Sequence, residues 1–447
     1  MLFLARYKSL QSRSKNVIYN SILSLICKFI SILLSFISTP LLLTCLGQEK
    51  YGIWASVLSI ISWIYYFDFG IGSGVRNKLA SSIALKDYIT AKNVICLGYV
   101  LTSIISILLV LFVAILLVFF DLSSFFEFNI TEEKINFVFF IACLFACINF
   151  VASLVNNLFF ALQKAAVVSF FNILGQLFFV LALLLFLVTE NKLLLYVALA
   201  EGWAQLLKNL IANFYAFLKN KDLRFSLKNL NFSYSKFIMT FGLQMFVLQI
   251  AALTLNCTDN IIISKYFGPF EVTPYDICYK CFALVNTFFV IFLSPLVSAY
   301  TEAYTKKDYS WIIKTLTNSF YLYVGFLIIL VVFALLFKTI AMYWLRTDLN
   351  YSYSLIFLIA LYFALLMFTH IFSSLLVGIG AIHEASFAMI CEAIINIPIS
   401  IYLAKYLELG VNGVILGSIC CMIIAVIVFP YKGLKIIFIL KQNKINC

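Results

Sequence analysis

Long apolar runs separated by short charged breaks constrain the fold of this chain more than any other feature. The first run extends from Val17 to Leu46 and the second from Tyr51 to Gly70, with a tight turn at residues 47–50 between them. About 20 apolar residues are enough for one helix to cross a bilayer. The first 70 residues therefore predict a helical hairpin embedded in a membrane.

The same plan is repeated to the C-terminus. Hydrophobic residues make up 64% of the chain and charged residues 11%, a balance that excludes an ordinary soluble domain. We therefore expect an all-α polytopic membrane protein with about 12 transmembrane helices. Divided at the charged breaks, the helices are expected at residues 17–46, 52–70, 93–120, 136–160, 166–189, 193–217, 237–264, 275–299, 315–337, 352–379, 384–404 and 411–430.

The distribution of lysine and arginine predicts how the chain crosses the membrane. With the N-terminus inside, the expected cytoplasmic segments hold 21 of these residues and the opposite segments hold 7. Basic residues concentrate on the cytoplasmic side of membrane proteins, so both termini are expected in the cytoplasm. Because the basic residues lie between apolar runs, the net charge of +12 does not indicate a nucleic-acid partner.

A basic segment near the middle of the chain predicts two halves. Gly47 and Gly268 each follow a long apolar run and precede an aromatic one, and both runs start on the inner side. The two halves of such a parallel repeat are related by a pseudo-twofold axis along the membrane normal. The expected parts are a cytoplasmic basic tail at 1–16, a six-helix half at 17–217, a cytoplasmic basic linker at 218–236, a second six-helix half at 237–430 and a basic tail at 431–447.

Charged residues lie inside the expected spans, and seven of them are singled out here. Each is costly in hydrocarbon unless it faces water or a partner, so the set predicts a hydrophilic cavity. They are Lys28, Asp68, Glu201, Lys208, Asp259, Lys280 and Glu392.

The sequence leaves two interpretations open for most of these charges. Lys28 lies near the middle of the first helix, where it either faces the cavity or extends to the inner interface. Glu201 and Lys208 are seven residues apart, which suits an internal ion pair or one cavity wall. Asp259 is either functional or interfacial, and Glu392 is either a proton-binding carboxylate or the partner of a lysine.

Cys278 and Cys281 have the spacing of a redox motif. They lie in an expected span without other metal-type ligands, so packing is the favoured interpretation and no metal or cofactor is expected.

The end of the second run carries a distinctive motif. Tyr51-Gly52-Ile53-Trp54 is followed by a segment from Trp63 to Leu79. This pattern resembles the second-helix signature of bacterial O-antigen and polysaccharide flippases, which belong to the multidrug/oligosaccharidyl-lipid/polysaccharide exporter superfamily. Glycines at alternate positions also predict a close backbone approach. The residues that carry the motif are Asp68, Gly70, Gly72, Gly74, Arg76 and Asn77.

The resemblance implies a lipid flippase rather than an enzyme. Its substrate would be undecaprenyl-diphosphate-linked oligosaccharide, an O-antigen or capsule repeat unit, moved across the bacterial inner membrane by alternating access. The resemblance also implies a cationic cavity between the halves and coupling to protons or sodium ions. Membrane lipid, a polysaccharide polymerase and chain-length proteins are the expected neighbours.

The candidate site residues form two groups. Substrate binding is assigned to Lys28, Arg76, Lys208 and Lys280, because a diphosphate needs positive charge. Ion coupling or gating is assigned to Asp68, Asn77, Glu201, Asp259 and Glu392.

Two alternatives remain. A multidrug or cation exporter of the same superfamily would need an anionic cavity, and three buried lysines against four acids do not decide between the two. A membrane polysaccharide polymerase or glycosyltransferase would be expected to have a sizeable external loop. The longest expected external loops, 121–135 and 338–351, are too short for that.

Overall fold

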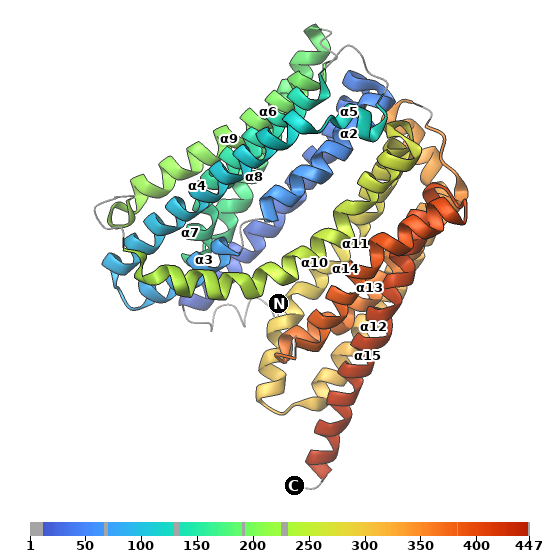
Figure 1. Cartoon of the computed structure of the whole chain (residues 1–447). Helices are drawn as coiled ribbons and strands as arrows, with labels where there is room; N and C mark the ends of the chain where they lie inside the picture. Colours follow the sequence, from blue (N-terminus) through green and yellow to red (C-terminus); the bar gives the residue numbers. More distant parts are fainter. Residues whose placement is uncertain are drawn as a thin grey trace. The chain divides into compact units, whose positions relative to one another are not determined.

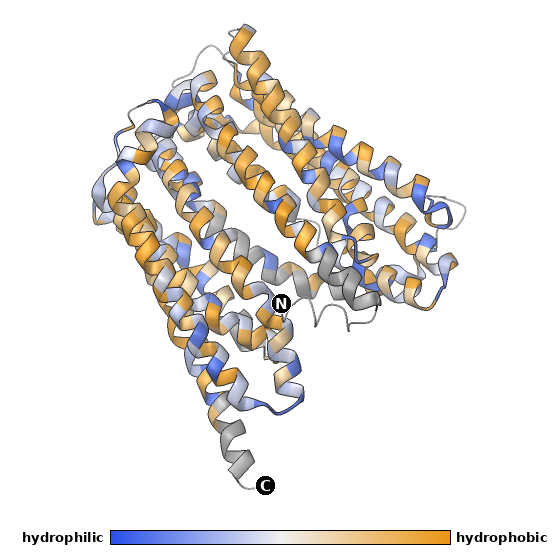
Figure 2. Cartoon of the chain, turned by 180° about the vertical axis from the view of Figure 1, so that it is seen from behind, coloured by the Kyte–Doolittle hydropathy of each residue, from blue (hydrophilic) through white to orange (hydrophobic). Residues whose placement is uncertain are grey.

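The computed structural model is helical throughout the part of the chain that it describes. That part comprises residues 12–66, 70–128, 134–189, 193–224, 231–347, 349–381 and 383–445, and it contains no strand. Within these residues, nine helices are long and apolar enough to cross a membrane. Figure 2 shows apolar residues along most of their length and many hydrophilic residues near their ends. The expected all-α membrane fold is confirmed.

The helices form two compact units. The first, here the N-unit, contains residues 1–47 and 60–247, and the second, the C-unit, contains residues 48–59 and 248–447. Two long helices, α2 (Ser12–Tyr66) and α10 (Ser235–Phe267), therefore each contribute to both units.

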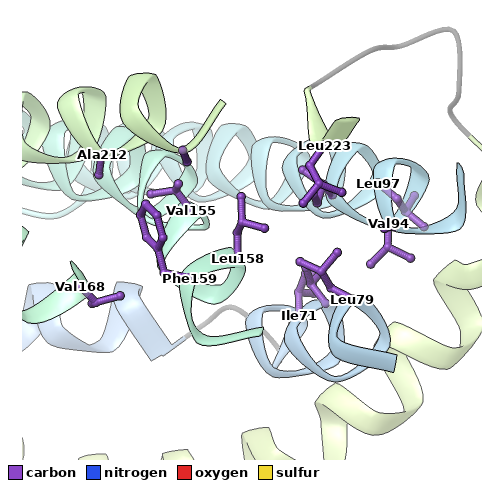
Figure 3. Close-up of a cluster of buried hydrophobic side chains, with 14 of the residues drawn as sticks. Ile71, Leu79, Val94, Leu97, Val155, Leu158, Phe159, Val168, Ala212 and Leu223 are labelled. Carbon is purple, nitrogen blue, oxygen red and sulfur yellow. The ribbon is translucent and has the colours of Figure 1, made fainter. Parts of the chain in front are cut away.

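In the N-unit, α3 packs on α4, α4 on α6, α6 on α9 and α9 on α8 (Figure 1). A fully apolar cluster that includes Leu79, Val94 and Leu158 joins α3, α4 and the short α7 (Figure 3). The elements between α2 and α10 are α3 (Ile71–Ala84), α4 (Tyr88–Phe119), α5 (Leu122–Phe126), α6 (Ile135–Ala152), α7 (Val155–Ala161), α8 (Ala165–Thr189), α9 (Leu194–Lys219), η1 (Lys221–Leu223) and η3 (Phe232–Tyr234).

In the C-unit, α11 packs on α13, and α13 and α14 both pack on α15. The last helix continues to Ile445, so most of the segment expected as a tail, 431–447, is helical. The elements are α11 (Pro269–Thr305), α12 (Tyr309–Leu345), α13 (Tyr353–Gly378), α14 (His383–Ile401), the π-helical turn η4 (Tyr402–Tyr406) and α15 (Val411–Ile445).

Two glycines break the backbone in the same way in the two halves. Gly47 has φ 74° and ψ 174°, and Gly268 has φ 88° and ψ 165°. This combination is essentially restricted to glycine. Because residues 48–50 are helical, the turn expected at 47–50 is reduced to one kink at Gly47.

A second turn is repeated with the same spacing along the chain. Lys86 and Lys307 both have a left-handed φ, 59° and 57°, and the following Asp87 and Asp308 each cap a helix. Lys86 follows Gly47 at the same distance in the sequence as Lys307 follows Gly268. Hydrogen bonds from the side chain and backbone of Thr90 lower the pKa of Asp87. These matching turns support the expected parallel repeat.

Candidate functional site

A polar pocket of about 600 Å³ opens beside α3 in the N-unit. The guanidinium of Arg76 lies over the ring of Phe160, 4.9 Å from its centroid, and its side chain is exposed. Stacking on an aromatic ring orients a guanidinium while leaving its N–H groups available to an anion. None of the described residues that line the pocket is acidic. They are Ser73, Arg76, Asn77, Ala80, Ser81, Phe160, Ala161 and Gln163.

The motif glycines hold α3 against the first turns of α10. Gly70 has φ 70°, and a Cβ there would meet the backbone of Gly242, while a Cβ on Gly74 would meet the backbone of Ile238. The expected close backbone approach is confirmed. Asp68, the acid of the motif, lies outside the described residues.

Lys208 and Glu201 both lie on α9, and the choice between an ion pair and one cavity wall stays a prediction. Lys208 also donates a hydrogen bond to Oδ1 of Asn172 on α8, over 2.9 Å. Gly175 on α8 leaves room for the Lys208 methylenes, because a Cβ at that position would lie 2.6 Å from Cδ of Lys208. This lysine is therefore part of a bonded contact between α8 and α9.

Lys28 on α2 has a different environment. Its side chain is exposed, and no hydrogen bond or ion pair joins it to the residues described. One turn earlier, Ser24 is buried and bonded to Ser169 over 2.8 Å. The structure therefore leaves the substrate role of Lys28 as a prediction.

Lys280 in the C-unit is neutralised by a partner that the sequence reasoning missed. Its Nζ lies 2.6 Å from Oδ2 of Asp276, one helical turn earlier on α11. The hydroxyl of Tyr51 donates to the same Asp276 oxygen over 2.9 Å and accepts from Lys280 over 3.1 Å. The Asp276 side chain is 9% exposed and that of Lys280 is 46% exposed.

The Asp276 carboxylate has a further donor. Nδ2 of Asn260 on α10 lies 3.2 Å from the second Asp276 oxygen and 3.2 Å from Oγ of Ser59. An acid and a lysine four residues apart on an expected helix were the available signal for this pair. The Tyr51 contact had no such signal, because Tyr51 is 225 residues away from Asp276.

Asp259 lies in a second, fully buried polar cluster of the C-unit. It accepts a 2.5 Å hydrogen bond from the Tyr275 hydroxyl, and Oγ of Ser418 lies 3.4 Å from both carboxylate oxygens. Asn396 on α14 donates to Ser418 over 2.9 Å, and Oγ1 of Thr258 lies 3.4 Å from the Asn396 oxygen. This carboxylate is buried among protein atoms, and the choice between a functional and an interfacial role stays a prediction.

Glu392 is 3% exposed on α14. Its Oε1 accepts a 2.7 Å hydrogen bond from the backbone N–H of Ala425 on α15. Within the described residues, no lysine or arginine forms an ion pair with it, so the structure does not support the lysine-partner interpretation. Cys278 and Cys281 are buried free thiols.

Curated relatives match nearly the whole chain. A Salmonella typhimurium protein named "Putative O-antigen transporter" is 24% identical over 91% of this chain and 93% of its own length. A Yersinia pseudotuberculosis protein named "Putative O-antigen export protein" is 22% identical over 89% of this chain and 91% of its own.

Solved structures share the fold. An inward-facing multidrug resistance MATE family transporter of the MOP superfamily matches with a TM-score of 0.76 and 17% identity, over 94% of this chain and 99% of that one. A MOP superfamily transporter from Pyrococcus furiosus matches with a TM-score of 0.65 and 17% identity, over 95% and 96%. The sequence profile of the polysaccharide biosynthesis protein family matches residues 17–300. This chain, with its transporter fold, therefore belongs to the family of polysaccharide biosynthesis proteins.

Proposed function

We propose that this protein is a flippase that moves undecaprenyl-diphosphate-linked oligosaccharide across the bacterial inner membrane. In this proposal both termini are cytoplasmic, transport proceeds by alternating access, and an ion gradient sets its direction. The protein catalyses no covalent chemistry, and a polysaccharide polymerase with its chain-length protein would consume the product. Family membership and the names of the curated relatives support a polysaccharide substrate.

The observation that carries the proposal is the pocket around Arg76. A diphosphate loses its hydration shell when it leaves water, and a fixed guanidinium replaces part of that shell with charge-assisted hydrogen bonds. Asn77, Ser73 and Ser81 add polar side chains to the same pocket. Among its described lining residues the site has an exposed guanidinium and no acid, which favours an anionic head group over a cationic drug.

The cluster around Asp259 is our candidate for ion coupling. The carboxylate accepts hydrogen bonds from the hydroxyls of Tyr275 and Ser418, and Ser418 is bonded in turn to Asn396, whose amide oxygen lies near the Thr258 hydroxyl. Oxygen ligands suit a proton or a small hard cation such as sodium. Glu392 is the second candidate, because a buried carboxylate without a basic partner is stabilised by taking up a proton.

Replacement of Arg76 tests the substrate assignment. In a flippase-deleted bacterium that supplies the matching sugar pathway, the wild type is expected to restore polymerised surface glycan. Arg76→Gln should lower glycan about tenfold or more, because hydrogen bonds to charged groups contribute about 1.5–3 kcal/mol. Arg76→Lys should retain part of the activity, since lysine keeps the positive charge but lacks the planar, forked guanidinium group.

Lys86→Gln is the matched control, because Lys86 is an exposed cation in the turn that follows α3. It should restore glycan like the wild type. Full glycan from a normally expressed Arg76→Gln protein would remove Arg76 from the substrate site. Failure of the wild type in the membrane would count against the flippase assignment for that sugar.

Replacement of Asp259 tests the coupling assignment. In proteoliposomes, an imposed proton or sodium gradient should accelerate flipping by the wild type but not by Asp259→Asn, which cannot change its charge. Glu271→Gln is the control, because Glu271 is an exposed acid at the start of α11. If the Asp259→Asn protein still responds to the gradient, another group couples transport to the ion. Glu392→Gln would then be the next variant to measure.

The second candidate function is export of a cationic compound, and the buried acids Asp259 and Glu392 favour it. This function is tested by measuring efflux of a fluorescent organic cation from cells that express the protein. Efflux above that of an Asp259→Asn strain, together with failed glycan complementation, would favour this function.

A further inference from the structure

A long apolar groove runs along the N-unit between α4, α6 and α9, with a volume of about 720 Å³. On α4 it extends from Tyr99 through Ser106 and Val110 to Leu111. At a rise of 1.5 Å per residue this is a length of roughly 18 Å, a little over half of the ~30 Å hydrocarbon core of a bilayer. The groove therefore has the length of one leaflet.

Hydrogen bonds between the three helices hold the walls of the groove at a set distance. Asn209 on α9 donates to Oδ1 of Asn149 on α6 over 3.0 Å, and Asn213 donates to the Ala152 carbonyl over 2.8 Å. Ser106 on α4 donates to the Cys147 carbonyl of α6 over 3.0 Å. These hydrogen bonds fix the distances between the three helices. The groove is therefore preformed. An empty groove in hydrocarbon would forfeit dispersion contacts along its walls, and a hydrocarbon chain restores them.

Basic residues gather at one end of the same three-helix surface. Lys92 precedes Tyr99 on α4 by seven residues, or two turns, and so lies on the same helix face. At the adjoining end of α9, η1 packs on both α4 and α9 through the buried Leu223 (Figure 3). The segment around η1 carries Lys221 and Arg224. Lys219 is bonded to the Tyr215 hydroxyl, on the face of α9 that contacts Phe159 and Phe171, so it lies away from the groove.

We propose that the N-unit binds an anionic phospholipid, with one acyl chain in the groove and the phosphate head group at Lys92, Lys221 and Arg224. The lipid belongs to the leaflet on the basic side, which the charge distribution assigns to the cytoplasm. Basic residues near the membrane surface attract an anionic head group electrostatically. An undecaprenyl chain is several times longer than one leaflet, so the length of the groove favours an acyl chain. This inference does not depend on the proposed function.

The test uses the full chain in nanodiscs of phosphatidylcholine. A small fraction of phosphatidylglycerol carries a photoreactive diazirine in one acyl chain, and cross-linked peptides are mapped by mass spectrometry. Labelling is expected to concentrate on the groove-lining parts of α4, α6 and α9. A phosphatidylethanolamine probe should label them several-fold less. The double variant Lys92→Gln/Arg224→Gln removes two of the positive charges and should lower phosphatidylglycerol labelling about tenfold or more.

Two tryptophan variants of α4 separate the groove from the rest of the surface. Val110→Trp fills the groove and should remove most of the label, whereas Leu108→Trp, at a 61% exposed position outside the groove, should not. Gel filtration confirms that both variants are folded. Even labelling of all exposed apolar residues, equal loss in both variants, or displacement of the probe by an equimolar amount of undecaprenyl phosphate would each overturn the proposal.

Discussion

Gly52→Ala should leave little folded protein, although alanine is normally the better helix residue. A Cβ on Gly52 would meet the backbone carbonyl of Pro269, which cannot rotate away as a side chain could. Neighbouring bonds fix this approach, since Thr273 donates to the Gln48 carbonyl over 2.6 Å and Gln48 donates to the Phe270 carbonyl over 3.1 Å. We expect the free energy of unfolding to fall by about 3 kcal/mol or more.

Gly325→Ala is the matched control, because Gly325 lies within α12 and a Cβ there would meet no atom within 4 Å. It should change stability by no more than about 1 kcal/mol, in the stabilising direction. Thermal unfolding in detergent and the yield of monodisperse protein compare the two variants. A Gly52→Ala protein that melts like Gly325→Ala would show that α2 and α11 are not in contact at this position.

Lys280→Met is expected to have the second largest effect. It leaves the Asp276 carboxylate, 9% exposed, with Tyr51 and Asn260 as donors but without a counter-charge. Removal of one partner of a fully buried pair costs about 3–5 kcal/mol, and the half-exposed position of Lys280 reduces this to about 2 kcal/mol. Added Asp276→Asn should recover much of the loss, because the amide oxygen still accepts from Tyr51.

Lys306→Met is the control for Lys280→Met, and the two variants are compared by their melting temperatures. Lys306 and Glu302 form an ion pair of the same helical spacing, but both side chains are more than 60% exposed. Its loss should cost less than about 0.5 kcal/mol. Equal melting temperatures for Lys280→Met and Lys306→Met would mean that the Asp276 pair is not stabilising. If the double variant of Asp276 and Lys280 restores surface glycan, Lys280 stabilises the fold and does not bind substrate.

The sequence predicts the helices well because each apolar run exceeds the length of a membrane span. The helix ends are less well predicted, since polar and aromatic residues extend several helices beyond their apolar centres. The segment expected as the helix 315–337 is α12, Tyr309–Leu345. The span expected at 136–160 is divided into α6 and α7, because residues 153 and 154 form a turn.

The candidate site is predicted in part. Arg76 and Asn77 were found because they belong to a local motif, and both line one pocket, while their roles stay predictions. Phe160, which orients Arg76, had no local signal. The contacts of Asp276 and Asp259 join residues far apart in the chain, and a single sequence does not reveal such pairs.

The linker is a further case. Residues 218–236 are expected to join the halves, and this stays a prediction; the compact N-unit extends to residue 247 within α10. The small residues Gly70 and Gly74 allow the first turns of α10 to pack on α3 and so explain this extension.

The contribution of residues 48–59 to the C-unit limits how the protein can be divided. The chain passes between the units at three points, 47/48, 59/60 and 247/248, rather than through one tether. A fragment that begins at residue 248 would lack Tyr51, Gly52 and Ser59, and with them part of its own interior. Cleavage of the polypeptide in the 218–236 segment would therefore yield two interlocked fragments instead of two independent domains.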